Sequence, residues 1–327
     1  MSVPLLQVRD LCVHFPVRTG GIFFGDYMQL KAVDGVSFDL APGETLGIVG
    51  ESGCGKSTLG RAVLQLLPPT SGAVAWLGQA VNLRDHADLK ARRRDMQVVF
   101  QDPLASLDPR MTAGDIIAEP LRNYHPELTA ADIRSRVKKM MELVGLLPAM
   151  INRYPHEFSG GQCQRIGIAR AMILKPKLVV CDEPVSALDV SIRAQVINLL
   201  MDLQREFQLS MLFISHDLAV VRHISHRVMV LYLGKVMETA ARESLYHLPH
   251  HPYTQALMAA VPIPDPDKER TKPRGLVLGD PPSPLNPPSG CVFRTRCPKA
   301  TEVCAQTPPP LELVNAAHEV ACHHWRP

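Results

Sequence analysis

Residues 3–48 alternate short apolar segments with polar ones, which is the pattern of an antiparallel sheet with one buried face. The predicted strands are residues 5–8, 12–15, 31–33 and 36–40. Gly20 to Gly25, with aromatic residues inside, is predicted to be a loop, and residues 41–44 a turn. We therefore expect an antiparallel β-subdomain at the start of the chain.

Three later segments are continuous apolar runs, which are typical of strands buried on both faces in a parallel sheet. They are residues 45–49, 178–183 and 211–216. Further strands are predicted over residues 72–78 and 96–100, and a closing hairpin over residues 227–238 around Gly234. Helical spacing of apolar residues predicts helices over residues 59–67, 164–174 and 190–207. Strands that alternate with helices in this way indicate an α/β core.

The pattern becomes helical between residues 103 and 158. The apolar residues that share one helix face there are Ile133, Val137, Met140, Val144 and Leu147. Thr129 and Asp132 have the spacing of a capping box just before this face. A mostly helical insertion, at about residues 103–160, is therefore expected between two parts of the α/β core.

The amino-acid composition of the chain changes after about residue 245. Thirteen of the 29 prolines lie between Pro262 and Pro310, so this part cannot form a regular helical or sheet domain. We expect an extended arm or a small module held by its cysteines. The predicted organisation is one domain over residues 1–245 and a proline-rich C-terminal extension over residues 246–327.

Length and charge narrow the class of protein. The 327 residues fit one large domain with an appendage, and the net charge of +3 is too small to indicate binding to nucleic acid. The basic run from Lys90 to Arg94 is interpreted as a solvated face. No apolar run is long enough to span a bilayer, and residues 1–10 lack the layout of a signal peptide. We expect a cytoplasmic protein that reaches a membrane only through a partner.

The clearest chemistry lies in one stretch that fits the phosphate-binding loop G-x-x-x-x-G-K-[ST]. Its residues are Gly50, Glu51, Ser52, Gly53, Cys54, Gly55, Lys56, Ser57 and Thr58. The glycines let successive N–H groups turn inward as an anion nest, and the following helix adds the positive end of its dipole. Lys56 is expected to reach the β- and γ-phosphates, while Ser57 would offer its hydroxyl to Mg²⁺.

Two carboxylates end the buried strand over residues 178–183. Asp182 is at the position that usually makes the second protein contact to Mg²⁺, and Glu183 would polarise the attacking water as general base. Capping of the next helix is the alternative for this acidic pair. His216 ends the neighbouring predicted strand, where it could reach the γ-phosphate.

A second candidate anion site is formed by Ser159, Gly160, Gly161 and Gln162. Small residues that open a helix leave its amide end free for a phosphate. The chain's own loop already holds one phosphate group, so the second site needs a nucleotide bound to another chain. We therefore expect two chains to pair head to tail, so that ATP closes the pair and hydrolysis separates it.

These motifs resemble, in order and spacing, those of the nucleotide-binding subunits of ABC transporters, which have a RecA-like P-loop NTPase fold. The resemblance covers about residues 5–245. In that family they are named Walker A, the Q-loop at Gln101, the signature at residues 158–162, Walker B and the H-switch at His216. The D-loop residues by this resemblance are Ser186, Ala187, Leu188 and Asp189.

The resemblance implies further roles. Phe15 would stack on adenine, the alternative being an ordinary core strand residue. Gln101 would contact Mg²⁺ and the attacking water, and would couple the site to the helical insertion, which docks onto a membrane permease. Two positions depart from the family pattern: Phe158 stands where Leu is usual, and Cys163 where Arg is common.

The tail resembles the C-terminal extension of oligopeptide and dipeptide permease ATPases, most of all the dipeptide branch. The residues that carry this resemblance are 251–257, 279–284 and 290–291 with the later cysteines. The resemblance implies an ATPase that drives peptide import at the cytoplasmic face of the inner membrane. Its implied partners are a second, homologous ATP-binding subunit in a heterodimer, two transmembrane permease subunits and, indirectly, a periplasmic or extracellular peptide-binding protein, with no nucleic acid.

Four of the eight cysteines crowd the tail, namely Cys291, Cys297, Cys304 and Cys322, with the spacing C-x5-C-x6-C-x17-C. In a reducing compartment such clustering favours a metal over disulfides, and four thiolates suit Zn²⁺ or an iron–sulfur cluster. No C-x2-C pair is present, which favours the cluster, and the resemblance implies a 4Fe-4S cluster at these cysteines. His318, His323 and His324 keep zinc as the alternative.

Three rival functions remain at this point. One is a nickel or other small-solute importer ATPase of the same family. Another is a soluble ABC ATPase that acts on nucleic acid or ribosomes, which the single nucleotide domain and modest charge disfavour. The third is a metal-responsive regulatory module, in which the cysteines carry the function and ATP is secondary.

Overall fold

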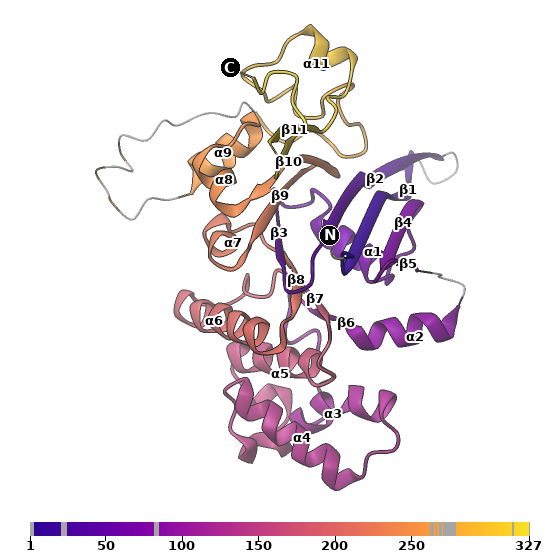
Figure 1. Ribbon diagram of the computed structural model, residues 1–327, viewed down its shortest axis with the longest axis vertical. Helices are drawn as coiled ribbons and strands as arrows, with labels where there is room; N and C mark the ends of the chain where they lie inside the picture. Colours follow the sequence, from indigo (N-terminus) through magenta and orange to yellow (C-terminus); the bar gives the residue numbers. More distant parts are fainter. Residues whose placement is uncertain are drawn as a thin grey trace. The chain divides into compact units, whose positions relative to one another are not determined.

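The computed structural model describes residues 3–20, 25–81, 85–261, 265, 267, 270, 279–315 and 317–326. The chain divides into two compact units (Figure 1). The first unit contains Met1–Leu40, Thr45–Ala80 and Ser215–Pro327. The second contains Ala41–Glu44 and Val81–Ile214.

The first unit holds two sheets and several short helices. Its N-terminal elements are β1 (Leu6–Gly20), β2 (Gly25–Leu40), β3 (Thr45–Val49), α1 (Lys56–Val63), β4 (Ser71–Trp76) and β5 (Gln79–Ala80). Its later elements are α7 (Leu218–Ile224), β9 (Arg227–Tyr232), β10 (Lys235–Ala241), α8 (Arg242–His247), α9 (Pro252–Ala260), α11 (Glu302–Gln306), β11 (Glu312–Asn315) and β12 (His318–Val320).

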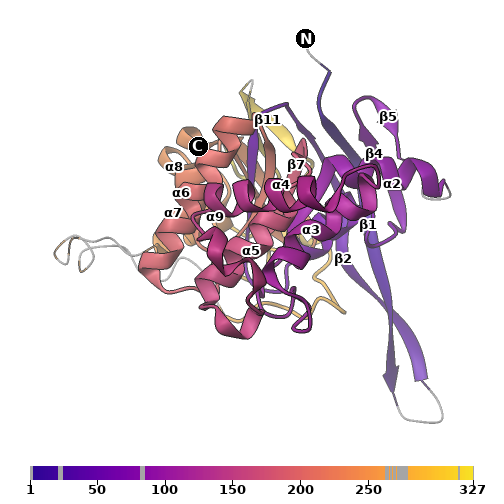
Figure 2. The same ribbon diagram turned by 90° about the horizontal axis from the view of Figure 1, so that it is seen from below.

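The predicted antiparallel β-subdomain is the sheet β2-β1-β4-β5. The prediction of four short strands is wrong in detail, because β1 and β2 each run on as one long strand (Figure 2). Bulges near Leu11 and Val13 shift the register, so the chain bends without leaving the sheet. The predicted loop has residues 21–24 outside the described part of the chain, while Gly20 and Gly25 pair within the hairpin.

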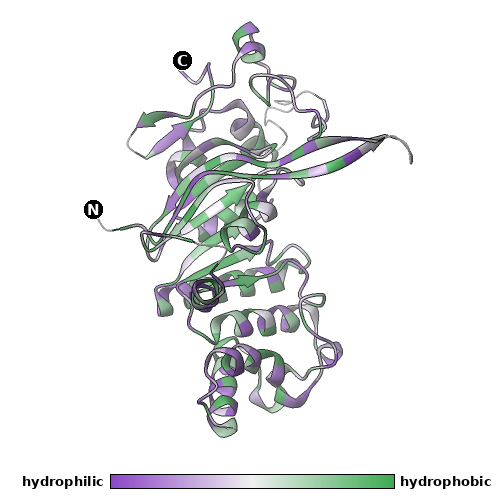
Figure 3. Ribbon diagram, turned by 90° about the vertical axis from the view of Figure 1, so that its right-hand side faces the viewer, coloured by the Kyte–Doolittle hydropathy of each residue, from purple (hydrophilic) through white to green (hydrophobic). Residues whose placement is uncertain are grey.

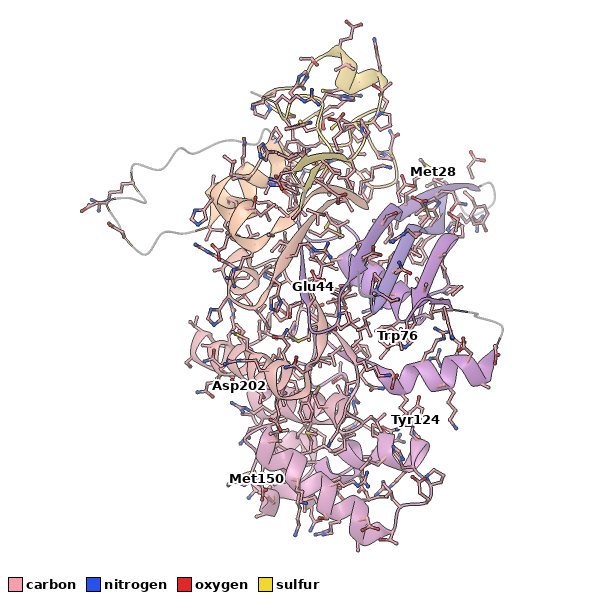
Figure 4. All side chains as sticks on the ribbon, viewed as in Figure 1. Met28, Glu44, Trp76, Tyr124, Met150 and Asp202 are labelled. Carbon is pink, nitrogen blue, oxygen red and sulfur yellow. The ribbon has the colours of Figure 1, made fainter. Side chains whose placement is uncertain are left out.

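The two ends of this sheet differ in burial. Trp76 closes β4 with a buried side chain, whereas Met28 on β2 is 37% exposed (Figure 4). The core of the sheet therefore lies toward β4, and the far end of the long hairpin presents its side chains to solvent.

The second sheet of this unit has the order β11-β12-β10-β9-β3. Strands β3 and β9 are parallel, and the predicted hairpin is confirmed as β9 and β10 around Gly234, which has a φ of 77°. Strand β12, from the proline-rich extension, pairs with β10. The extension is therefore part of the same sheet as the strand before the phosphate-binding loop.

The second unit combines three parallel strands with helices. Its elements are α2 (His86–Asp95), β6 (Met96–Val99), α3 (Ala113–Tyr124), α4 (Ala130–Leu143), η1 (Pro148–Asn152), η2 (Pro155–Glu157), α5 (Gly160–Met172), β7 (Leu178–Asp182), α6 (Val190–Phe207) and β8 (Ser210–Ile214). The strand order is β8-β7-β6, and every residue of β7 and β8 is buried, as the apolar runs predict. The strands appear largely green in the hydropathy view (Figure 3).

The helical insertion is confirmed, with α3 packed against both α4 and α5. The Thr129–Asp132 capping box is present at the start of α4. The predicted face is too long, because α4 ends at Leu143 and Gly145 turns the chain with a φ of 74°. Leu147 consequently lies beyond the helix, 64% exposed.

The predicted boundary between two domains near residue 245 stays a prediction. In the structure, the described residues after it pack in the same unit as the phosphate-binding loop. None of the helices in the described part of the chain combines the length and the apolar character needed to span a bilayer.

Candidate functional site

The phosphate-binding loop lies between β3 and α1, as predicted. Gly50, Gly53 and Gly55 have φ values of 152°, 77° and 102°, which favour glycine. A Cβ at Gly50 would lie 2.2 Å from the carbonyl oxygen of Leu231, and one at Gly55 would lie 1.9 Å from that of Ala32. The loop is therefore seated against the backbone of its own unit at two points that admit no side chain.

The side chain of Lys56 lies inside this loop. Its side chain is buried, and its Nζ donates hydrogen bonds to the carbonyl oxygens of Gly50 at 2.8 Å and Glu51 at 2.9 Å. The ammonium thus holds the start of the loop closed while its positive charge stays where an anion would bind.

Glu51 has contacts that sequence reasoning missed. Its backbone N–H donates to the hydroxyl of Tyr253 at 2.9 Å, and both of its carboxylate oxygens accept from Nη1 of Arg296, at 3.0 and 2.9 Å. These partners lie 202 and 245 residues further along the chain, so no local pattern indicates them. Burial would lower the pKa of Arg296, but hydrogen bonds to Glu51 and Tyr232 raise it, and the guanidinium stays charged.

The predicted general base lies in the second unit at the end of β7. Glu183 follows the buried Asp182, and its Oε2 accepts a hydrogen bond from Nε2 of Gln101 at 3.1 Å. The backbone of Glu183 has a φ of 47°, and its N–H donates to the carbonyl oxygen of Ile214 at 3.0 Å. The structure therefore brings together two of the three predicted catalytic residues, each at the carboxyl end of a parallel strand.

His216, the third predicted catalytic residue, belongs to the first unit and is exposed just after Ser215. Ser57 also lies in the first unit, at the start of α1, whereas Asp182 lies in the second. That these two sets form one magnesium nucleotide site stays a prediction.

The signature residues open α5 earlier than expected, because the helix begins at Gly160 rather than at residue 164. Ser159 and Gln162 form a capping box: the Gln162 N–H donates to Ser159 Oγ at 3.3 Å, and the Ser159 N–H donates to Gln162 Oε1 at 3.0 Å. The predicted free amide end is therefore corrected, since the amides of Ser159 and Gln162 are satisfied within the chain. Ser159 and Gly160 are nevertheless exposed.

Gly161 explains why small residues are needed here. A Cβ at this position would lie 2.5 Å from Cγ2 of Ile192 on α6. The helix start thus packs closely on α6 through its glycine while its other side remains exposed.

The predicted D-loop residues connect Glu183 to α6. Ser186 Oγ donates to the carbonyl oxygen of Glu183 at 3.1 Å, and Ala187 follows it. The carbonyl oxygen of Leu188 accepts from Arg193, and Asp189 immediately precedes α6. Phe15, the predicted adenine contact, lies half-buried on β1 opposite Leu30. Its role stays a prediction.

The four tail cysteines are all free thiols, and Cys291 and Cys304 are buried. Burial raises the pKa of Cys291 to about 11, and the neighbouring thiols of Cys304, Cys322 and Cys297 act in the same direction. The four side chains are thus close enough to interact electrostatically. The backbone N–H of His324 points to Cys322 Sγ at 3.4 Å, which is the kind of contact that steadies a thiolate ligand.

A second group of possible metal ligands lies outside the tail. Among the described residues, one trio brings its ligand atoms within 4.8 Å of one another, and it is Cys12, His14 and Asp34. In the trio, Lys235 already pairs with Asp34 at 2.8 Å, which opposes a metal cation there.

The fold and these residues define a class, the ATP-binding domains of ABC transporters. The family described as ABC transporter matches residues 33–186, and the family described as oligopeptide/dipeptide transporter, C-terminal region, matches residues 237–304. The dimeric ATP-binding cassette MJ0796 bound to ADP and Pi has a TM-score of 0.64 and 28% identity, over 72% of this chain and 98% of that one. Clostridium perfringens cbiO1, with a TM-score of 0.63 and 23% identity over 76% and 92%, shares the fold.

Relatives that match nearly the whole chain identify the branch of the ABC transporter family. The oligopeptide transport ATP-binding protein OppF of Salmonella typhimurium is 62% identical over 97% of this chain and 95% of its own. OppF of Escherichia coli is 61% identical over the same shares, and a putative peptide import ATP-binding protein of Brucella ovis is 56% identical over 98% of each chain. The chain belongs to the ATP-binding proteins of the oligopeptide/dipeptide ABC transporter family.

Proposed function

We propose that this protein binds and hydrolyses ATP to drive the import of oligopeptides or dipeptides through a membrane permease. The observation that carries the proposal is the joint presence of a glycine-bounded phosphate loop and the Gln101–Glu183 pair in a chain 62% identical to an oligopeptide transport ATP-binding protein. The OppF relatives are oligopeptide transport ATP-binding proteins and the Brucella ovis relative is a putative peptide import ATP-binding protein. The tail's resemblance to the dipeptide branch keeps dipeptides among the cargoes to be tested.

The residue roles follow from charge and position. Backbone N–H groups of residues 50–58 and the Lys56 ammonium bind the phosphates, and Phe15 stacks on adenine. The oxygen donors Ser57, Gln101 and Asp182 are the type that Mg²⁺ prefers. Magnesium, when bound, neutralises charge that develops on the phosphates.

Glu183 accepts the proton of the attacking water, and its hydrogen bond to Gln101 at 3.1 Å orients the carboxylate for that task. His216 contacts the γ-phosphate. Because Gln101 begins the segment that leads into the helical insertion, movement of the amide away from Glu183 transmits the state of the site to that insertion.

Two ATP-binding subunits act as a head-to-tail pair. Ser159 and Gly160 are exposed at the start of α5, so they are available to the nucleotide of a facing chain. The D-loop residues Ser186 to Asp189 follow Glu183 closely in the chain, and Ser186 Oγ donates to the Glu183 carbonyl oxygen, so they are also proposed to face the second chain. The facing chain is a homologous subunit in a heterodimer, and both dock on two permease subunits at the cytoplasmic face of the inner membrane. A peptide-binding protein outside delivers the cargo.

Cys291, Cys297, Cys304 and Cys322 hold a 4Fe-4S cluster in this proposal, with zinc as the alternative. Support comes from their free thiols and from the electrostatic influence of Cys304, Cys322 and Cys297 on Cys291. Four cysteine thiolates are the ligand set that such a cluster would take. The cluster, when bound, supplies cross-links that hold the extension. Anaerobically purified protein should show broad visible absorbance that Cys297→Ser removes; a colourless protein with one zinc per chain would favour zinc.

The experiment that tests the transport proposal is peptide-stimulated ATPase activity. The full complex, purified from membranes and reconstituted in vesicles, is assayed with a dipeptide, with a pentapeptide and with Ni²⁺ in the presence of the binding protein. Stimulation by peptide and its loss in Glu183→Gln are expected, while the exposed control Glu206→Gln should behave like the wild type. Stimulation by Ni²⁺ alone, or purification with nucleic acid instead of a membrane complex, would refute peptide import.

A further inference from the structure

Glu51, the second residue of the phosphate-binding loop, joins three different partners. Its carbonyl oxygen accepts from Lys56 Nζ at 2.9 Å, its N–H donates to the Tyr253 hydroxyl at 2.9 Å, and its carboxylate accepts from Arg296 at 2.9 and 3.0 Å. One residue therefore connects the lysine of the loop to two side chains that come from the C-terminal extension.

Both extension side chains are held rigidly. Tyr253 is fully buried, and its ring packs on Tyr232 with centroids 4.7 Å apart and on Phe293 with centroids 5.3 Å apart. Arg296 is 8% exposed, and its Nη1 also donates to the Tyr232 hydroxyl at 3.4 Å. Because these partners have little freedom, they fix the position of Glu51 instead of following it.

The ion pair also solves an electrostatic problem. A carboxylate within a loop that binds a polyphosphate repels that ligand, and the repulsion is strong where water is partly excluded. Arg296 lies against both carboxylate oxygens, so it neutralises Glu51 and leaves Lys56 as the effective charge of the loop. The side chain of Glu51 is 29% exposed and that of Arg296 is 10% exposed, so the solvent screens the pair only in part.

We propose that Arg296 and Tyr253 are positioning residues through which the C-terminal extension sets the ATP affinity of the phosphate loop. Arg296 cancels and orients the Glu51 carboxylate, and the Tyr253 hydroxyl holds the Glu51 N–H, so the loop is shaped before the nucleotide arrives. The proposal rests on the function proposed above for the loop, and it adds that the extension completes the nucleotide site of its own chain.

The test measures binding of Mg-ATP, Mg-ADP and AMP to the full chain, together with KM and kcat for ATP in the assembled complex. Arg296→Met should weaken ATP binding about 10-fold, which corresponds to about 1.4 kcal/mol, and should raise KM with little change in kcat. The loss should be smaller for ADP and absent for AMP, because the exposed Glu51 charge acts on the phosphates. Arg296→Lys should recover part of the affinity, and the nearby control Arg294→Met should bind like the wild type.

The double variant Glu51→Gln with Arg296→Met separates charge from structure. Removing the carboxylate should restore ATP affinity to within about threefold of the wild type, since the repulsion is gone. Tyr253→Phe keeps the ring in place and removes only the hydroxyl, and it should weaken ATP binding about threefold without lowering the thermal midpoint appreciably. The double variant and Tyr253→Phe therefore test the positioning role even if Arg296→Met alone folds poorly.

Outcomes against the proposal are distinct. If the wild type binds ATP and Arg296→Met binds it equally well, the positioning role is refuted while the proposed function stands. If the double variant binds as weakly as Arg296→Met, or if AMP binding falls as much as ATP binding, the role is structural and the electrostatic argument fails. Absence of ATP binding by the wild type would overturn the proposed function, and this inference with it.

Discussion

Replacing His318 by alanine should destabilise the first unit strongly, because it removes one partner of a buried pair. His318 Nε2 lies 2.7 Å from Glu238 Oε1, and the two side chains are 1% and 0% exposed. Glu238 also accepts from the N–H groups of His250 at 2.7 Å and His251 at 3.1 Å. Burial would raise the pKa of Glu238, but these hydrogen bonds lower it, so the carboxylate is charged at neutral pH.

The size of the effect follows from what remains after the substitution. Removing the hydrogen-bond partner of a buried charge costs about 3–5 kcal/mol, since the Glu238 carboxylate is left less well compensated in the interior. The two N–H donors still solvate Glu238 in part, so we expect the lower end, about 3 kcal/mol. For a unit of this size each kcal/mol shifts the thermal midpoint by about 2–4 °C, which gives a fall of about 6–12 °C.

The assay is thermal unfolding followed by circular dichroism, with tryptophan fluorescence as a second probe. Trp325 donates from Nε1 to Glu312 at 3.0 Å and so reports on the extension. The matched control is His247→Ala, whose side chain is 72% exposed and whose loss should change stability by less than about 0.5 kcal/mol.

A second variant tests the charge argument itself. Glu238→Gln combined with His318→Ala removes the carboxylate charge and should be more stable than His318→Ala alone. If His318→Ala lowers the midpoint no more than His247→Ala does, or if the double variant is the less stable of the two, the reasoning about a buried uncompensated charge is refuted.

Three further predictions concern other parts of the molecule. Burial lowers the pKa of His251 to about 4, so the wild type should lose stability as the pH falls from about 6.5 towards 4. His251→Asn should flatten this pH dependence of the unfolding midpoint. An unchanged pH profile in that variant would contradict the role of His251. Glu183→Gln should bind ATP with near-normal affinity but lose at least about 100-fold in turnover, measured as phosphate release; normal turnover would exclude Glu183 as the base. Gly161→Ala should lower the free energy of unfolding by about 2 kcal/mol, because its Cβ would lie 2.5 Å from Ile192 Cγ2. Adding Ile192→Ala to the same chain should relieve this strain. If Gly161→Ala lowers stability equally with and without Ile192→Ala, the contact does not matter.

Much of the fold could be predicted because its signals are local. The buried strands β7 and β8 follow from continuous apolar runs, and the start of α4 follows from the Thr129–Asp132 spacing. The phosphate-binding loop follows from glycines whose φ values only a residue without a Cβ adopts easily. In each case the interacting groups lie within a few residues of one another, so their order along the chain is sufficient information.

Local signals failed where a neighbouring segment decides the outcome. The strands β1 and β2 read as shorter pieces, because bulges at Leu11 and Val13 break the alternation without breaking the pairing. The helix α4 stops at Gly145, although the apolar spacing continues to Leu147. The helix α5 begins before the residue that the apolar spacing predicts, because a capping box and two glycines carry little hydrophobic signal.

The sequence by itself determined the class of this protein and the loop that is predicted to bind phosphate, because that chemistry depends on a short stretch of backbone and its flanking elements. Only the tertiary structure decided that the proline-rich extension belongs with the phosphate loop, through Arg296 and Tyr253 on Glu51 and through His318 on Glu238. Those contacts join residues 80 to 245 positions apart. No periodicity predicts them, because they form only when β3, β9, β10 and β12 assemble in one sheet.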